Sequence, residues 1–235
     1  MHEPVALFDL DDTLIPRRAV FPKWAAEFSD QHSVPLHWLL ENDPEYLSRR
    51  PAFFELAKTT FGLGPSAEAM HDQYVQRMPE LVEPDPEVQA LLAGLREERW
   101  RLGVVTNGLA QNQMRKVMRA ELYDLVDEVV ISGAVGVHKP DERIFHHATD
   151  QLGVAPGPHV VMIGDNLQDD IEGARLAGLT TVWISHGRPL TRPGPRPQHT
   201  ARTLAKAVEM LRAIQGRPAG GQAAATAHNR SGRRP

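Results

Sequence analysis

Two carboxylates, Asp9 and Asp11, stand one residue apart directly after an apolar run at residues 5–8. Such a run is typical of a buried parallel strand, and α/β proteins place their chemistry at the carboxyl ends of these strands. Paired carboxylates at this point suit a metal-assisted nucleophile beside a neighbouring acid or base. Because Asp is also common where chains bend, an acidic turn is the simpler interpretation of this segment taken alone.

Three later segments carry further polar residues of the kinds that such chemistry needs. They are Val-Val-Thr-Asn-Gly at residues 104–108, Val-His-Lys-Pro at residues 137–140, and Met-Ile-Gly-Asp-Asn at residues 162–166, the last followed by Asp169 and Asp170. In this order, and together with the first motif at residues 9–13, they resemble the haloacid dehalogenase-like superfamily. The resemblance is to the phosphatase form with a helical cap inserted after the first strand, and it covers roughly residues 4–214. It implies an α/β fold, a Rossmann-like parallel sheet with helices on both faces, plus a small all-helical cap domain.

The resemblance implies the chemistry of a phosphoric monoester hydrolase. Asp9 would be the nucleophile that forms an aspartyl-phosphate, and Asp11 would protonate the leaving alcohol and then deprotonate the attacking water. A carboxylate that attacks a phosphate dianion meets a like charge, so a cation is required, and Mg²⁺ prefers hard oxygen ligands. Asp9 and Asp165 would supply carboxylates to Mg²⁺, and Asp11 a backbone carbonyl.

Asp170 stands five residues after Asp165, at the start of the next predicted helix. In the family this spacing carries a second acid that supports the metal end of the site, so Asp170 completes the predicted metal set. Acids also favour helix N-termini for electrostatic reasons, and this is the simpler interpretation of Asp169.

Binding a phosphate requires positive charge and hydrogen-bond donors. The chain has five lysines against 21 arginines, so the choice of lysine at position 139 favours a compact point charge over a planar fork. We expect Lys139 to act as a catalytic residue that neutralises the nucleophile and the transferring phosphoryl group. Thr106 offers a hydroxyl, and Asn107 and Gly108 offer backbone N–H groups near a helix start. Thr106, Asn107 and Lys139 therefore form the predicted phosphate site.

Alternating strands and helices are expected to bring these residues to one edge of a parallel sheet. Residues 1–15 hold the first strand and the nucleophile loop. Residues 16–84 are predicted to form a helical cap, because no plausible strand appears between about residues 19 and 78 and helices are expected at 20–31, 36–42, 44–61 and 65–78. After a proline-containing hinge, residues 85–215 return to the core, with strands at 102–106, 128–132, 159–163 and 180–184 and helices at 87–98, 109–120, 141–152, 169–177 and 202–214. Residues 216–235 are expected to be a disordered tail.

Composition limits the other functional classes. Hydrophobic residues make up 41% and charged residues 24% of the chain, as in ordinary globular proteins, and the absence of cysteine excludes a thiolate nucleophile or metal site. The tail carries four arginines and no acid, so a charge of +4 there leaves −8 on the remaining residues. This negative net charge outside the tail argues against a nucleic-acid partner, which would need a basic surface. With no recognisable signal peptide or membrane span, the expected location is cytoplasmic, without a membrane partner, and the oligomeric state is not predicted.

Three alternatives share parts of the pattern. A phosphomutase with the same cap type has all four motifs, and would return phosphate to a bound sugar phosphate. A 2-haloacid dehalogenase uses the same Asp nucleophile, but typically lacks a carboxylate at the position of Asp11. A non-enzymatic scaffold that binds a partner would be favoured by loss of the four central residues, which are all present, namely Asp9, Asp11, Lys139 and Asp165.

The substrate is expected to be a small phosphorylated metabolite. A sheet edge that recognises phosphate cannot distinguish the group attached to it, so selectivity should come from the cap and the flap that leads to it. Arg17 and Arg18 follow the nucleophile loop most closely and are the candidate substrate contacts. The alternative interpretation is that both are charged residues of the flap that face solvent. Sugar phosphate, nucleotide and phosphorylated acid all remain open.

Overall fold

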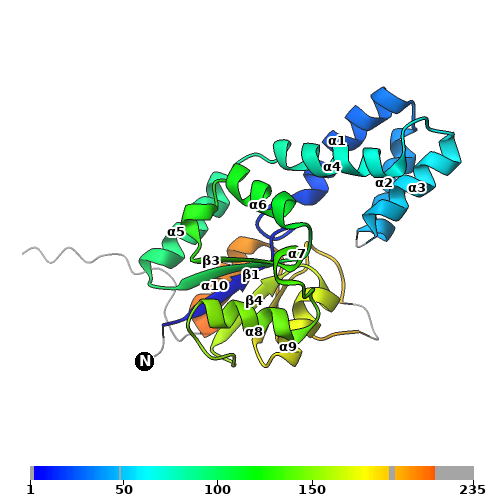
Figure 1. The fold of residues 1–235 in the computed structure, drawn as a ribbon. Helices are drawn as coiled ribbons and strands as arrows, with labels where there is room; N and C mark the ends of the chain where they lie inside the picture. The colour runs from blue at the N-terminus through cyan, green and yellow to red at the C-terminus, as the bar shows by residue number, and fades with distance from the viewer. Residues whose placement is uncertain (1–2, 48, 191–193, 215–235) are drawn as a thin grey trace, which may run out of the picture.

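The computed structural model describes residues 3–47, 49–190 and 194–214. At its centre is a parallel sheet in the order β3-β2-β1-β4-β5-β6, with helices on both sides (Figure 1). The strands are β1 (Val5–Phe8), β2 (Arg101–Thr106), β3 (Glu128–Ile131), β4 (Val160–Gly164), β5 (Thr180–Ile184) and β6 (His199–Ala201). From β1 the chain adds strands β2 and β3 on one side of the sheet, and then β4, β5 and β6 on the other side. The strand order therefore switches between β1 and β4, and open α/β sheets form their ligand crevices at such a switch point.

The sheet is covered on both faces because successive side chains of a strand point to opposite sides. In β1, Ala6 and Phe8 belong to one apolar cluster, whereas Val5 and Leu7 belong to another. The first cluster includes side chains of α5 (Pro86–Glu97), α6 (Ala110–Arg119) and α10 (Leu204–Ile214), and the second includes side chains of α8 (Glu142–Gln151) and α9 (Gly173–Leu176). The predicted fold class is therefore confirmed.

Four α-helices lie between β1 and α5 in the sequence and project from one end of the sheet (Figure 1). They are α1 (Arg17–His32), α2 (Leu36–Asn42), α3 (Arg50–Phe61) and α4 (Ala67–Glu80), with the 3₁₀ turn η1 (Asp43–Tyr46) between α2 and α3. Their contacts are largely aromatic: the Trp24 ring lies 5.0 Å from Phe28, 5.8 Å from Phe54 and 4.9 Å from Tyr74. The boundaries 16–84 for a separate cap domain stay a prediction.

The observed elements differ from the predicted ones in two places that bear on function. Helix α1 begins directly after Pro16, so Arg17 and Arg18 lie in its first turn rather than in a flap. Strand β6 was not predicted, because its three residues are not an apolar run, but it pairs with β5 from Val182↔His199 onward. Residues 216–235, the predicted tail, lie outside the described residues. Among the described helices, none has the length and apolar character needed to cross a membrane.

Candidate active site

Asp9 follows β1 directly and is fixed by the sheet. Its backbone N–H donates to the carbonyl of Ile163 on β4 at 2.9 Å, which extends the parallel pairing by one residue. The side chain is buried, and its Oδ1 accepts a hydrogen bond of 2.6 Å from Lys139 Nζ. Burial raises the pKa of Asp9, and although Lys139 opposes this, the negative charges of Asp170 and Asp165 add to it.

Lys139 is surrounded by acceptors. Its ammonium group donates to Asp9 Oδ1 at 2.6 Å, to Asp170 Oδ1 at 2.6 Å and to the carbonyl of Val105 at 2.8 Å, so each of its three protons has a partner. Burial disfavours the charged amine, but Asp170 and Asp9 outweigh that effect and raise the pKa of Lys139. The lysine is therefore a fixed positive charge beside Asp9.

The backbone of Lys139 is held by Asn107. The side-chain amide of Asn107 donates to the Lys139 carbonyl at 3.0 Å, and its oxygen accepts from the Lys139 N–H at 2.9 Å. The Asn107 side chain is thus engaged in positioning the lysine, whereas the group of Asn107 predicted to bind phosphate is its backbone N–H. Thr106 is also engaged, since its Oγ1 accepts a hydrogen bond of 2.7 Å from Gln113.

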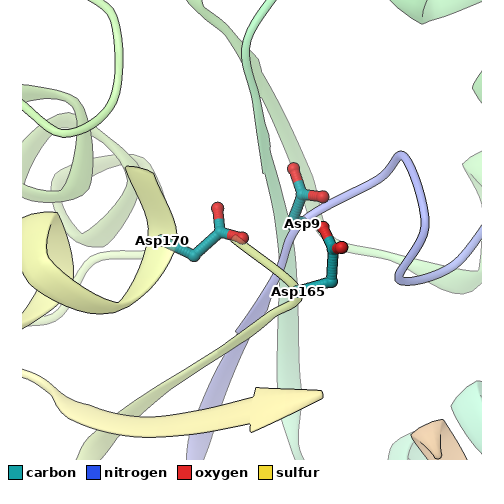
Figure 2. Close-up of side chains that lie close together, drawn as sticks. All are labelled: Asp9, Asp165 and Asp170. Carbon is teal, nitrogen blue, oxygen red and sulfur yellow. The ribbon is translucent and has the colours of Figure 1, made fainter. Parts of the chain in front are cut away.

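Three carboxylates converge from different elements at the carboxyl edge of the sheet. Asp9, Asp165 and Asp170 each offer an oxygen within 4.8 Å of the others, and Figure 2 shows the three side chains directed toward a common space. Asp165 follows β4, whereas Asp170 lies in a wide π-helical turn, η3 (Leu167–Glu172). Single π turns often occur at functional sites.

A glycine makes room for this arrangement. A Cβ at Gly164 would lie 2.2 Å from Asp170 Oδ2, so no other residue fits without displacing Asp170. Asp170 is fully buried and cannot move easily, because its Oδ1 accepts from Lys139 and its Oδ2 from the Asn166 N–H at 2.9 Å. The glycine before Asp165 in the motif is therefore explained by the close approach of the Gly164 backbone to the Asp170 side chain.

The acidic cluster has the chemistry of a Mg²⁺ site. Its donors are hard carboxylate oxygens, which Mg²⁺ prefers. The pKa of Asp165 is raised to about 7, by burial first and then by the charges of Asp170 and Asp12, against the opposing effects of Arg188 and Arg18. Because the negative charges of the cluster are not fully offset by the protein, a bound cation would relieve them. The residues present fit the predicted metal.

Asp11 contacts a different element, the helix α6. Both of its carboxylate oxygens accept from Lys116 Nζ, at 2.8 and 2.7 Å, and Oδ2 accepts also from Gln113 Nε2 at 3.0 Å. Burial alone would raise the pKa of Asp11, but Lys116, with smaller contributions from Arg17 and Gln113, lowers it. The carboxylate is thus stabilised in its ionised form.

All of the predicted site residues line one cleft of about 600 Å³. The nine are Asp9, Asp11, Arg17, Arg18, Thr106, Asn107, Lys139, Asp165 and Asp170. Arg17 is buried, and its guanidinium group forms two hydrogen bonds with Asp43, of 2.9 and 2.6 Å. Arg18 instead reaches Asp165 Oδ2 at 2.8 Å. Their roles as substrate contacts stay predictions.

Sequence reasoning missed three residues that hold the site together. Lys116 and Gln113 bind Asp11, and Arg188 donates to Asp165 Oδ2 at 3.0 Å. The scarcity of lysine that drew attention to position 139 applies equally to Lys116 and could have identified it. For Arg188, one of 21 arginines, the sequence offers no comparable signal.

Comparisons with known proteins decide the family. A family model described as haloacid dehalogenase-like hydrolase matches residues 4–178. The chain belongs to this family. The glyceraldehyde 3-phosphate phosphatase of Methanopyrus kandleri is 36% identical to this haloacid dehalogenase-like hydrolase over 200 residues, or 77% of this chain and 84% of that protein.

One further relative is also a phosphatase, and a solved structure shares the fold. The phosphoserine phosphatase of Thermus thermophilus is 44% identical over 102 residues, or 43% of this chain and 41% of that protein. The fold matches that of a haloacid dehalogenase-type hydrolase from Bacillus subtilis with a TM-score of 0.74, at 22% identity, over 90% of this chain and 99% of that one. The predicted family and the predicted enzyme class, a phosphatase, are confirmed.

Proposed function

We propose that this phosphatase is Mg²⁺-dependent and hydrolyses a small phosphorylated metabolite through an aspartyl-phosphate on Asp9. The observation that carries the proposal is the position of Asp9, which accepts from a buried, fully hydrogen-bonded ammonium group and belongs to a cluster of three acidic side chains in one cleft. Charge neutralisation and positioning are what phosphoryl transfer chiefly requires. The relatives named for glyceraldehyde 3-phosphate and phosphoserine make three-carbon phosphate esters the first substrates to assay.

In the first step, an oxygen of Asp9 forms a bond to phosphorus while the bond between phosphorus and the ester oxygen breaks. The leaving oxygen takes a proton from Asp11 and departs as an alcohol. In the second step, water attacks the phosphorus of the aspartyl-phosphate and gives its proton to Asp11. The bond between Asp9 and phosphorus breaks, inorganic phosphate leaves, and both aspartates return to their starting state.

Lys139 supplies positive charge to these two steps, and a bound metal would supply more. Mg²⁺, held by Asp9, Asp165 and the backbone carbonyl of Asp11 with support from Asp170, would offset the like charges of phosphate and nucleophile. Lys139 contributes a second, permanent charge, which is aimed at Asp9 before substrate binds and therefore needs no reorganisation. Asp11 first has to gain a proton, which its contact with Lys116 disfavours, so good leaving groups should react more readily than poor ones.

The cap, residues 16–84, is proposed to select the substrate. Pro44 and Leu47 line the cleft from this side together with Arg17 and Arg18. In this proposal these side chains would meet the group that leaves, whereas the residues at the sheet edge would meet the phosphate. A phosphomutase would use the same nucleophile, and it is distinguished by phosphate transfer to a bound sugar phosphate instead of release to water.

The proposal is tested by phosphate release from an aryl phosphate and from a panel of phosphometabolites, with Mg²⁺ or with excess chelator. We expect release that depends on Mg²⁺ and disappears in Asp9→Asn, because a neutral amide cannot attack phosphorus. The Asp11→Asn protein, given the aryl phosphate, should gain the mass of one phosphate on Asp9. Full activity in chelator would refute the metal assignment, and a phosphate adduct on another residue would refute the mechanism.

A further inference from the structure

The catalytic loop is fixed on one side by the sheet, but Asp11 lies beyond the strand end and needs another support. The Asp11 side chain is 24% exposed and lines the cleft, and both of its carboxylate oxygens accept hydrogen bonds from α6. There the Lys116 side chain is only 6% exposed, and Gln113 is almost fully buried. Two buried polar side chains thus converge on one carboxylate from a single helix.

The helical spacing explains why both residues can reach Asp11. Gln113 and Lys116 are three residues apart on α6, so they lie on the same face of the helix. Helix α6 begins shortly after β2, and Thr106 ends that strand. Gln113 Nε2 donates to both Asp11 Oδ2, at 3.0 Å, and Thr106 Oγ1, at 2.7 Å. The amide therefore connects the acid–base residue to the predicted phosphate-binding hydroxyl.

We propose that Lys116 and Gln113 are positioning residues that hold Asp11 in register with the phosphate site. The proposal rests on the function proposed above, in which Asp11 activates the water that hydrolyses the aspartyl-phosphate. Lys116 clamps both oxygens and so fixes the plane of the carboxylate, whereas Gln113 fixes its distance from Thr106. The lysine acts only through Asp11, since its ammonium group donates to no other side chain that the structure describes.

The test measures how fast the aspartyl-phosphate is hydrolysed in Lys116→Met, which keeps the length of the side chain and removes its charge. Hydrogen bonds to charged groups are strong, so we expect kcat to fall by about 10- to 10²-fold, with KM nearly unchanged. Phosphate should also accumulate on Asp9 during turnover. Lys206→Met is the matched control, because Lys206 is an exposed lysine whose ammonium group pairs with Glu209 alone among the residues that the structure describes, and it should behave as the wild type.

A double-mutant cycle separates positioning from general structural damage. In an Asp11→Asn background, adding Lys116→Met should change the decay of the phosphoenzyme by less than about 2-fold, because residues that act as a unit are not additive. Equal losses in both backgrounds would overturn the proposal. If Lys116→Met does not fold, Gln113→Leu provides the same cycle, with an expected loss of about 5- to 10-fold for the hydrogen bond to Asp11.

The outcomes also distinguish this inference from the function on which it rests. Normal turnover in Asp11→Asn would refute the role of Asp11 itself. A slow Asp11→Asn protein together with wild-type phosphoenzyme decay in folded Lys116→Met would refute the positioning role alone.

Discussion

Replacing Lys139 with methionine should test whether this lysine is needed by the fold as well as by the chemistry. Its ammonium group is the shared partner of Asp9 and Asp170, at 2.6 Å from each, and its side chain is only 2% exposed. Breaking a buried ion pair by removing one partner typically costs about 3–5 kcal/mol, because the other charge stays buried and uncompensated. The Val105 carbonyl loses a donor as well, which adds about 1–3 kcal/mol if nothing replaces it. We expect Lys139→Met to lower the free energy of unfolding by at least about 3 kcal/mol.

The assay is urea denaturation in chelator, so that no metal substitutes for the lost charge. Asp170→Asn serves as the second variant, and Lys139→Met/Asp170→Asn completes the cycle. Because the double variant removes one of the two uncompensated carboxylates, it should be less destabilised than the sum of the single variants by about 1–3 kcal/mol. Additive losses, or a Lys139→Met protein as stable as the wild type, would refute the view that Lys139 balances the buried acids.

Three further changes have expected outcomes. Gly164→Ala should lower the free energy of unfolding by about 1–3 kcal/mol and reduce activity, because the added Cβ would overlap Asp170. Gly64→Ala is the control and should change neither, because a Cβ there meets nothing within 4 Å. Urea denaturation and phosphate release measure the two effects. Asp43→Asn should destabilise the protein by about 3–5 kcal/mol in the same denaturation assay, because it leaves two buried guanidinium groups without a counterion. Burial lowers the pKa of His32, so the folded state resists protonation of this residue and the protein loses stability as the pH falls below the unfolded pKa of about 6.5. His32→Phe should therefore flatten the dependence of the unfolding free energy on pH below that value. An unchanged slope would contradict this.

The strands and the acidic ends of the strands could be predicted because they depend on local sequence. Apolar runs identify β1 and β4, and the aspartates that follow them belong to ordered motifs. The strand β6 could not be predicted, since His-Thr-Ala has no strand pattern of its own and pairs with β5 only in the folded chain. Short edge strands of this kind depend on tertiary context more than on propensity.

The partners of the catalytic residues could not be read from the sequence in the same way. Lys116 lies 105 residues from Asp11 along the chain, so only the packing of α6 against the nucleophile loop brings them together. Arg17 shows the opposite problem: it follows the motif closely, yet its guanidinium group is turned to Asp43, which it shares with Arg50. Sequence proximity indicated the right cleft but not the direction of the side chain.

The polar contacts of α6 indicate to which part of the molecule this helix belongs. On one face, Lys116 and Gln113 bind Asp11 in a buried setting, where losing a partner is costly. On another face of α6, Arg115 binds Glu80 at the end of α4, and both of these side chains are nearly half exposed. Exposed ion pairs of this kind contribute only about 0–1 kcal/mol. The polar contacts of α6 therefore hold it to the catalytic loop more firmly than to α4. A change in the position of α4 would break the weaker contact first, and Asp11 would stay fixed beside the phosphate site.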